Sequence, residues 1–144
     1  MDIYFSCSLT GGRQDQPVYA AMVAMLQALG HRVLTAHLAD EAVLAADATQ
    51  SPEAVFDRDT AWLRACDVLI AEVSTPSHGV GFEVAYALEL GKPVLCLARA
   101  GVRVSKMLTG IRRAGYAFGA YGDTGQARAH MEAFLRATAP GSAR

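Results

Sequence analysis

The sequence predicts an α/β fold in which helices cover both faces of a parallel sheet. Short apolar runs alternate along the chain with segments in which apolar residues recur every three or four positions. The run DVLIAEV at 67–73 is almost continuously apolar, which is typical of a strand buried on both faces of its sheet. Such alternation favours a parallel sheet with crossover helices over separate helical and sheet domains.

Composition indicates one globular domain, expected at 1–138 with a frayed tail at 139–144. The chain has 144 residues, of which 52% are hydrophobic, and this is enough for a core. Its formal net charge of −1 gives no general attraction to nucleic acid or to an anionic membrane. The three cysteines, Cys7, Cys66 and Cys96, lie in or beside apolar runs without metal-ligand spacing. We therefore expect buried reduced thiols, no metal or other cofactor, and, without a signal peptide or membrane-length apolar run, a cytoplasmic location.

Five segments have the length and composition of strands. They are residues 3–7, 31–38, 67–73, 92–98 and 115–121, the last of them expected at an edge. We expect a flavodoxin-like (Rossmann-like) three-layer sandwich with the strand order 2-1-3-4-5. In such sheets ligands bind at the carboxyl ends of the strands, near the point where the order reverses. This rule nominates the loops after residues 6 and 72.

Five helices are expected between and after these strands. The first runs from Pro17 and stops at Gly30. Ser51 and Pro52 are typical of a helix start, and their helix should reach about Cys66. The others follow the loop at 74–83, cover 104–111 and end the domain around 127–135. Residues 39–51 have weak periodicity and predict a loop or a short helical lid.

The loop SCSLTGGRQD follows the first strand and combines small hydroxyl residues with glycines. Ser8, Thr10, Gly11 and Gly12 suit a phosphate at a helix N-terminus, although neither a P-loop nor a GxGxxG pattern is present. A tight strand-to-helix turn is the alternative at this point.

The loop STPSHGVGFE follows the third strand and carries a carboxylate. Gly79 and Gly81 would let the backbone pass close to a ligand. Glu83 is expected where this loop becomes a helix, but Val80 occupies the position where a capping box needs Ser or Thr. In the first helical turn the helix dipole would keep Glu83 ionised, as a carboxylate nucleophile requires.

A second carboxylate, Asp59, falls on the apolar face of its helix. It lies four residues after Val55 and three before Trp62, whereas Asp57 and Arg58 should face solvent. An acid on a core-facing stripe needs a partner or a cavity. The alternative is an edge position satisfied by a backbone donor.

Three further residues are weaker candidates. Tyr4 alternates with Ile3 and Phe5 in the first strand, His37 ends the second, and Glu72 stands at the carboxyl end of the third. For Tyr4 and His37 the alternatives are a core tyrosine with one hydrogen bond and an ordinary surface histidine. A pair of acids such as Asp59 and Glu83, near a phosphate-friendly loop, suits glycosyl chemistry in which one attacks the anomeric carbon and the other handles protons.

Several blocks of the chain resemble the nucleoside 2-deoxyribosyltransferase family, and within it the 2′-deoxynucleoside 5′-phosphate N-hydrolases. The resemblance runs from residue 3 to about 111. The blocks that carry it are IYFSCSLTGGRQDQPVYAAMV, VLTAHLAD, FDRDTAWLRACDVLIAEVSTPSHGVGFEVAYALELGKPVLCL and VSKMLTGI. It implies a flavodoxin-like fold, a homodimer, and hydrolysis of a deoxynucleoside monophosphate to free base and 2-deoxyribose 5-phosphate.

The resemblance also implies roles for individual residues. Glu83 matches the nucleophile that forms a covalent deoxyribosyl ester, Asp59 the acid that assists base departure and water activation, and Tyr4 the residue that orients the nucleophile. His37 matches a histidine on the base side of the pocket. The phosphate-binding serines match Ser8, Ser77 and, from the partner subunit, Ser105.

One departure concerns the phosphate. Thr10 stands where these hydrolases carry arginine, so a charged contact is lost unless Arg13 or another basic residue replaces it. Transfer of deoxyribose between bases, hydrolysis of ribonucleotides, and nucleotide binding without catalysis are the alternatives that the sequence leaves open.

Overall fold

Five parallel strands form one sheet in the order β2-β1-β3-β4-β5, so the predicted fold class and strand order are confirmed. The computed structural model describes residues 1–9, 15–39 and 49–139. The strands are β1 (Asp2–Ser6), β2 (Arg32–Val33), β3 (Val68–Glu72), β4 (Val94–Arg99) and β5 (Tyr116–Tyr121). β1 and β3 are neighbours in the middle of the sheet and pair with Ile3 opposite Val68.

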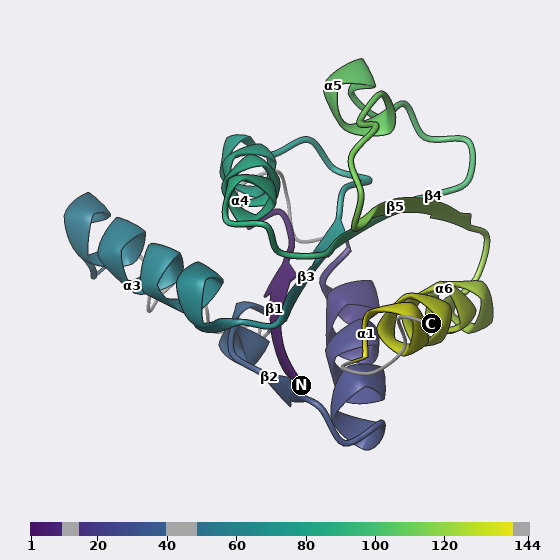
Figure 1. Cartoon of the computed structure of the whole chain (residues 1–144), viewed down its shortest axis with the longest axis horizontal. Coiled ribbons are helices and arrows are strands. Elements are labelled where there is room, and N and C mark those ends of the chain that lie inside the picture. The colour runs from purple at the N-terminus through teal and green to yellow at the C-terminus, as the bar shows by residue number, and fades with distance from the viewer. Residues whose placement is uncertain (10–14, 40–48, 140–144) are drawn as a thin grey trace.

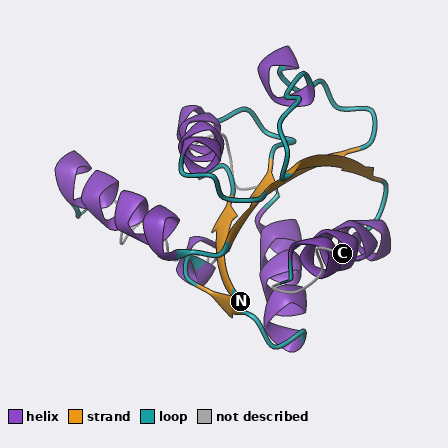
Figure 2. Ribbon diagram, viewed as in Figure 1, coloured by secondary structure: helices purple, strands orange, loops and turns teal. Residues whose placement is uncertain are grey.

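Helices cover both faces of this sheet. α1 (Gln16–Ala28) and α6 (Thr124–Thr138) pack on one face, and α3 (Pro52–Ala65) and α4 (His78–Glu89) lie on the other (Figure 1). A short 3₁₀ helix, η1 (Ala36–Ala39), follows β2, and the single-turn α5 (Lys106–Thr109) follows β4 (Figure 2). None of the helices in the described part of the chain is long and apolar enough to span a membrane.

The alternation of side chains along β1 divides the core into two halves. Ile3 and Phe5 join the cluster under α1 and α6, whereas Tyr4 joins the cluster under α3 and α4. Successive side chains of a strand point to opposite faces, so residue 6 faces the same helices as Tyr4. All three cysteines are buried, as predicted.

Two predicted elements are shorter than expected. The second strand ends at Val33 and not at residue 38, because the Thr35 hydroxyl bonds to both the N–H and the carbonyl of Phe5. These side-chain bonds occupy backbone groups of β1 that a longer strand would pair. The helix expected over 104–111 is one turn, from Ser105 as N-cap to Gly110 as C-cap. The predicted lid at 39–51 and the tail at 139–144 lie largely outside the described residues.

Candidate active site

Glu83 lies in the second turn of α4, one turn later than predicted. Ser77 is the N-cap and accepts a hydrogen bond from the Val80 N–H at 3.4 Å, so the helix begins at His78. Gly79 and Gly81 are therefore helical and not part of a loop. Because Ser77 caps the helix and Glu83 is its sixth residue, Glu83 does not serve as a helix-start residue.

Two hydroxyl groups from β1 hold the Glu83 carboxylate. The Tyr4 hydroxyl donates to Oε1 at 2.8 Å, and the Ser6 hydroxyl donates to Oε2. Tyr4 was predicted from the sequence, but Ser6 was missed. The signal was available, since Ser6 is two residues after Tyr4 on a buried strand and so shares its face.

The electrostatic environment of Glu83 differs from the one expected. Burial raises its pKa to about 7, while hydrogen bonds from Ser6 and Tyr4 act in the opposite direction and the charge of Asp59 adds to the rise. The helix dipole was expected to keep Glu83 ionised, but desolvation is the largest influence and shifts its pKa upward. Burial beside Glu83 also raises the pKa of Tyr4, so its phenol stays protonated and remains a donor.

Asp59 lines the same cavity as Glu83, as the apolar stripe on its helix predicted. Its partner is a side chain and not a backbone donor, since the Arg58 Nε lies 2.8 Å from Asp59 Oδ1. The prediction that Arg58 faces solvent is wrong. Its side chain is 21% exposed and its guanidinium stacks over Trp62 at 5.1 Å from the ring centroid. Asp57 is exposed, as predicted.

The cavity that Asp59 and Glu83 share, called here the Glu83 cavity, has a volume of about 400 Å³. This is within the range of small-molecule sites. Two half-exposed phenylalanines line it, Phe56 at 53% and Phe82 at 47% exposure, with ring centroids 6.0 Å apart. Phe82 in turn stacks on Tyr86. The two acids therefore stand beside aromatic surface that is open to a flat ligand.

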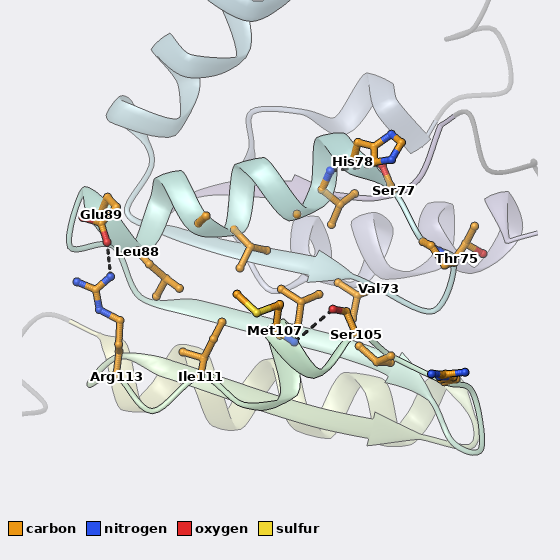
Figure 3. A pocket seen from close by; sticks show the side chains of 18 residues that line it. Val73, Thr75, Ser77, His78, Leu88, Glu89, Ser105, Met107, Ile111 and Arg113 are labelled. Carbon is orange, nitrogen blue, oxygen red and sulfur yellow. Dashed lines mark hydrogen bonds and ion pairs between the residues drawn. The ribbon is translucent and has the colours of Figure 1, made fainter.

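A second cavity, of about 610 Å³, is lined by α4 together with Ser105, Met107 and Leu108 (Figure 3). It uses a different side of α4 from the Glu83 cavity, since no α4 residue lines both. Ser77 and Ser105 both line it, so two of the predicted phosphate ligands share one cavity. Each also caps a helix, since the Ser105 hydroxyl accepts a hydrogen bond from the Met107 N–H at 3.2 Å. Glu83 is not among the residues that line this second cavity. Ser105 and Glu83 of one chain thus belong to cavities on different sides of α4.

The other predicted ligands are placed as follows. Ser8 is buried just beyond β1. His37 lies on η1 and not at a strand end; it is exposed and packs edge-on against Trp62 at 5.3 Å. Its predicted contact with the base stays a prediction. Thr10, Gly11, Gly12 and Arg13 lie outside the described residues.

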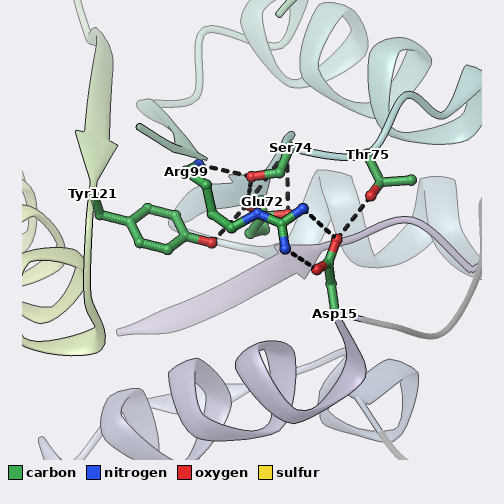
Figure 4. A network of polar contacts seen from close by, with 6 residues as sticks. All are labelled: Asp15, Glu72, Ser74, Thr75, Arg99 and Tyr121. Atoms are coloured by element: carbon green, nitrogen blue, oxygen red, sulfur yellow. Dashed lines mark hydrogen bonds and ion pairs between the residues drawn. The ribbon is translucent and has the colours of Figure 1, made fainter. Parts of the chain in front are cut away.

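Glu72 belongs to a separate polar network and not to the Glu83 cavity. It follows Val68 and Ile70 on the face of β3 opposite to Glu83, and it is 1% exposed. The hydroxyls of Ser74 and Tyr121 donate to Glu72 (Figure 4). The expectation that Glu72 faces the site is wrong for the cavity that holds Glu83.

The same network connects three segments at the carboxyl edge of the sheet: the residue before α1, the loop after β3 and the end of β4. The Arg99 guanidinium pairs with Asp15, and the Thr75 hydroxyl donates to Asp15 at 2.8 Å (Figure 4). The Arg99 N–H donates to the Ser74 hydroxyl at 2.7 Å. The segment that leads to Ser77 is therefore bonded to the start of α1 and to the end of β4.

An open parallel sheet of this order, with a partly buried carboxylate at the end of its central strands, defines a Rossmann-like protein with a candidate nucleophilic site. The sequence profile of the nucleoside 2-deoxyribosyltransferase family matches residues 3–127. The chain belongs to that family.

Two relatives are named for nucleotide hydrolysis. The 5-hydroxymethyl-dUMP N-hydrolase of Mus musculus is 44% identical over 112 aligned residues, in a match that covers 75% of this chain and 64% of the mouse protein. A Thermofilum pendens protein, provisionally named 2′-deoxynucleoside 5′-phosphate N-hydrolase 1, is 40% identical over 144 residues, covering 99% of this chain and 97% of its own.

Two solved structures share the fold. One is the CMP N-glycosidase of Clostridium botulinum, with a TM-score of 0.70 and 17% identity over 94% of this chain and 100% of its own. The other is the 2-deoxyribosyltransferase of Bacillus psychrosaccharolyticus, with a TM-score of 0.64 and 20% identity over 89% of this chain and 90% of its own.

Proposed function

We propose that the protein hydrolyses the N-glycosidic bond of 2′-deoxynucleoside 5′-monophosphates, with Glu83 as the nucleophile. The observation that carries the proposal is the Glu83 carboxylate, which two β1 hydroxyls hold beside Asp59 in a cavity of about 400 Å³. Family membership and the hydrolases among the relatives support this class of substrate.

The reaction would proceed in two displacements. An oxygen of Glu83 bonds to C1′ while the C1′–N bond breaks, and the bonding electron pair leaves with the base, which takes up a proton delivered through Asp59. Water then attacks C1′ of the deoxyribosyl ester and gives its proton to Asp59. The C1′–O bond to Glu83 breaks, which frees the carboxylate and releases 2-deoxyribose 5-phosphate.

The 5′-phosphate would be bound by Ser8 and Ser77 together with Ser105 of a second copy in a homodimer. Within one chain Ser77 and Ser105 line the same second cavity and neither lines the Glu83 cavity, so the division of these serines between two copies follows the family resemblance. Thr10 in place of arginine predicts a weaker charged contribution to phosphate binding. His37, Gly79 and Gly81 remain candidates for contacts with the base and the sugar phosphate.

The test is release of free base, followed by chromatography, for the wild-type protein and for Glu83→Gln. We expect the variant to keep its fold and to lose kcat/KM by roughly a thousandfold or more, as removal of a covalent nucleophile does. Turnover in Glu83→Gln close to that of the wild type would contradict the assignment. Wild-type binding of deoxynucleotide without any base release would indicate a binding module.

Substrate comparison then separates the remaining candidates. The unphosphorylated deoxynucleoside should be a much poorer substrate if the serines bind phosphate, and equal efficiency would count against that role. A ribonucleoside monophosphate tests the requirement for a deoxyribose. Addition of a second free base tests transfer, because a new nucleotide would form from the same covalent intermediate.

A further inference from the structure

Ser6 is placed with little freedom beside the proposed nucleophile. Its side chain is fully buried, and its backbone pairs with Ala71 in the centre of the sheet. The hydroxyl donates to Glu83 Oε2, while the hydroxyl of Tyr4, two residues earlier, donates to Oε1. One regular strand thus supplies a donor to each oxygen of one carboxylate.

A single donor would not orient this carboxylate. The terminal torsion of a glutamate side chain is broad, so the group can turn about a lone hydrogen bond from Tyr4. A second bond, to the other oxygen, fixes the plane of the carboxylate. Each carboxylate oxygen has two acceptor sites, so one lone pair on each oxygen remains available to a substrate in the Glu83 cavity.

We infer that Ser6 is a positioning residue for Glu83, and that its hydroxyl fixes the direction in which the carboxylate meets the substrate. Its effect on catalysis rests on the function proposed above. The hydrogen bond itself is a property of the folded chain and can be tested without turnover.

The charges around Glu83 predict what loss of this bond does. Burial and Asp59 on α3 raise the pKa of Glu83, and Arg58 on the same helix is paired with Asp59. Ser6 and Tyr4 on β1 lower this pKa, and Ser6 has the larger effect of the two. Without Ser6, Glu83 should therefore hold its proton to higher pH.

The direct test is a ¹³C NMR titration of the glutamate carboxyl carbons in the wild type and in Ser6→Ala, with Glu83→Gln identifying the Glu83 signal. Loss of a hydrogen bond to a charged group should move the Glu83 midpoint upward by about one pH unit. In Ser6→Cys the thiol is a weaker donor than the hydroxyl, so the Glu83 midpoint should fall between those of the wild type and Ser6→Ala. Thr35→Val is the matched control, because it removes a buried hydroxyl bonded to β1 at Phe5 without touching Glu83. An unchanged midpoint in Ser6→Ala would overturn the inference.

Kinetics supply the second readout. With a deoxynucleoside monophosphate at pH 7, Ser6→Ala should lose roughly tenfold in kcat with little change in KM, and the acid limb of its pH profile should move upward. If Ser6→Ala loses rate with no shift of the acid limb, and Thr35→Val loses a similar amount, the role of Ser6 is only structural and the inference is contradicted. If the wild type releases no base, the proposed function fails, while the titration still decides whether Ser6 holds Glu83.

Discussion

At the scale of single residues, the Glu83 carboxyl group weakens the fold as it ionises. The pKa of this group is about 7 in the folded chain, raised from the ordinary value of 4.5 that it has when exposed to water. Between these two values the folded state binds more protons than the unfolded state, so the free energy of unfolding falls as pH rises. A shift of this size corresponds to about 3 kcal/mol, fully lost above pH 7. Buried charge at a candidate active site is a frequent source of such a cost.

Replacement of Glu83 by glutamine should remove this pH dependence. We compare the free energy of unfolding of Glu83→Gln with that of the wild type at each pH. This difference should shift in favour of the variant by up to about 3 kcal/mol between pH 4.5 and pH 8. Urea unfolding at both pH values measures the change. Glu89→Gln is the control, because that carboxylate is 72% exposed and should show little difference. A pH-independent difference for Glu83→Gln would contradict the raised pKa.

The family resemblance implied one partner of Glu83, and the sequence patterns missed the other for a physical reason. The strand pattern alone made Tyr4 a weaker candidate, because a tyrosine in such a position is usually a core residue with one hydrogen bond. Ser6 is a small residue that any strand tolerates, and its meaning depends on α4 crossing the end of β1. The desolvation of Glu83 likewise depends on packing between distant segments, which no local pattern contains.

At the scale of elements, the ion pair between Asp15 and Arg99 ties the start of α1 to the end of β4. The Asp15 side chain is 7% exposed and also accepts a hydrogen bond from Thr75, whereas Arg99 is 43% exposed. The apolar patterns of the sequence predicted α1 and β4, the two elements that this pair connects. It did not predict this pair, because Asp15 and Arg99 meet through the order of strands and not through sequence spacing.

Loss of Arg99 should leave a buried carboxylate without its countercharge. We expect Arg99→Met to lower the free energy of unfolding by about 2 kcal/mol, less than for a fully buried pair because Arg99 is partly solvated. Adding Asp15→Asn should recover part of this loss, since the uncompensated charge is then gone. Arg113→Met breaks an exposed pair with Glu89 and should cost about 0.5 kcal/mol or less. Equal losses for the two arginine variants in urea unfolding would refute the argument.

At the scale of the whole molecule, α4 separates two groups that the proposed reaction needs together. Glu83 lines the cavity on one side of this helix, and Ser105 lines the cavity on the other. Met107, next to Ser105 on α5, is 82% exposed, so this part of the chain presents apolar surface. In a symmetric dimer each copy can offer Ser105 to the other, because a two-fold interface repeats every contact.

Mixed dimers of two variants, each expected to be impaired when refolded alone, test this exchange. If Ser105 acts across the interface, a dimer of one Glu83→Gln chain and one Ser105→Ala chain contains one site with both native residues and one site with neither. Random co-refolding should then restore about a quarter of all sites, because half of the dimers are mixed and each has one intact site of two. Each variant refolded alone gives the baseline for base release from a deoxynucleoside monophosphate. If Ser105 serves the site of its own chain, no intact site can form, and activity of the mixture stays at the average of the two baselines.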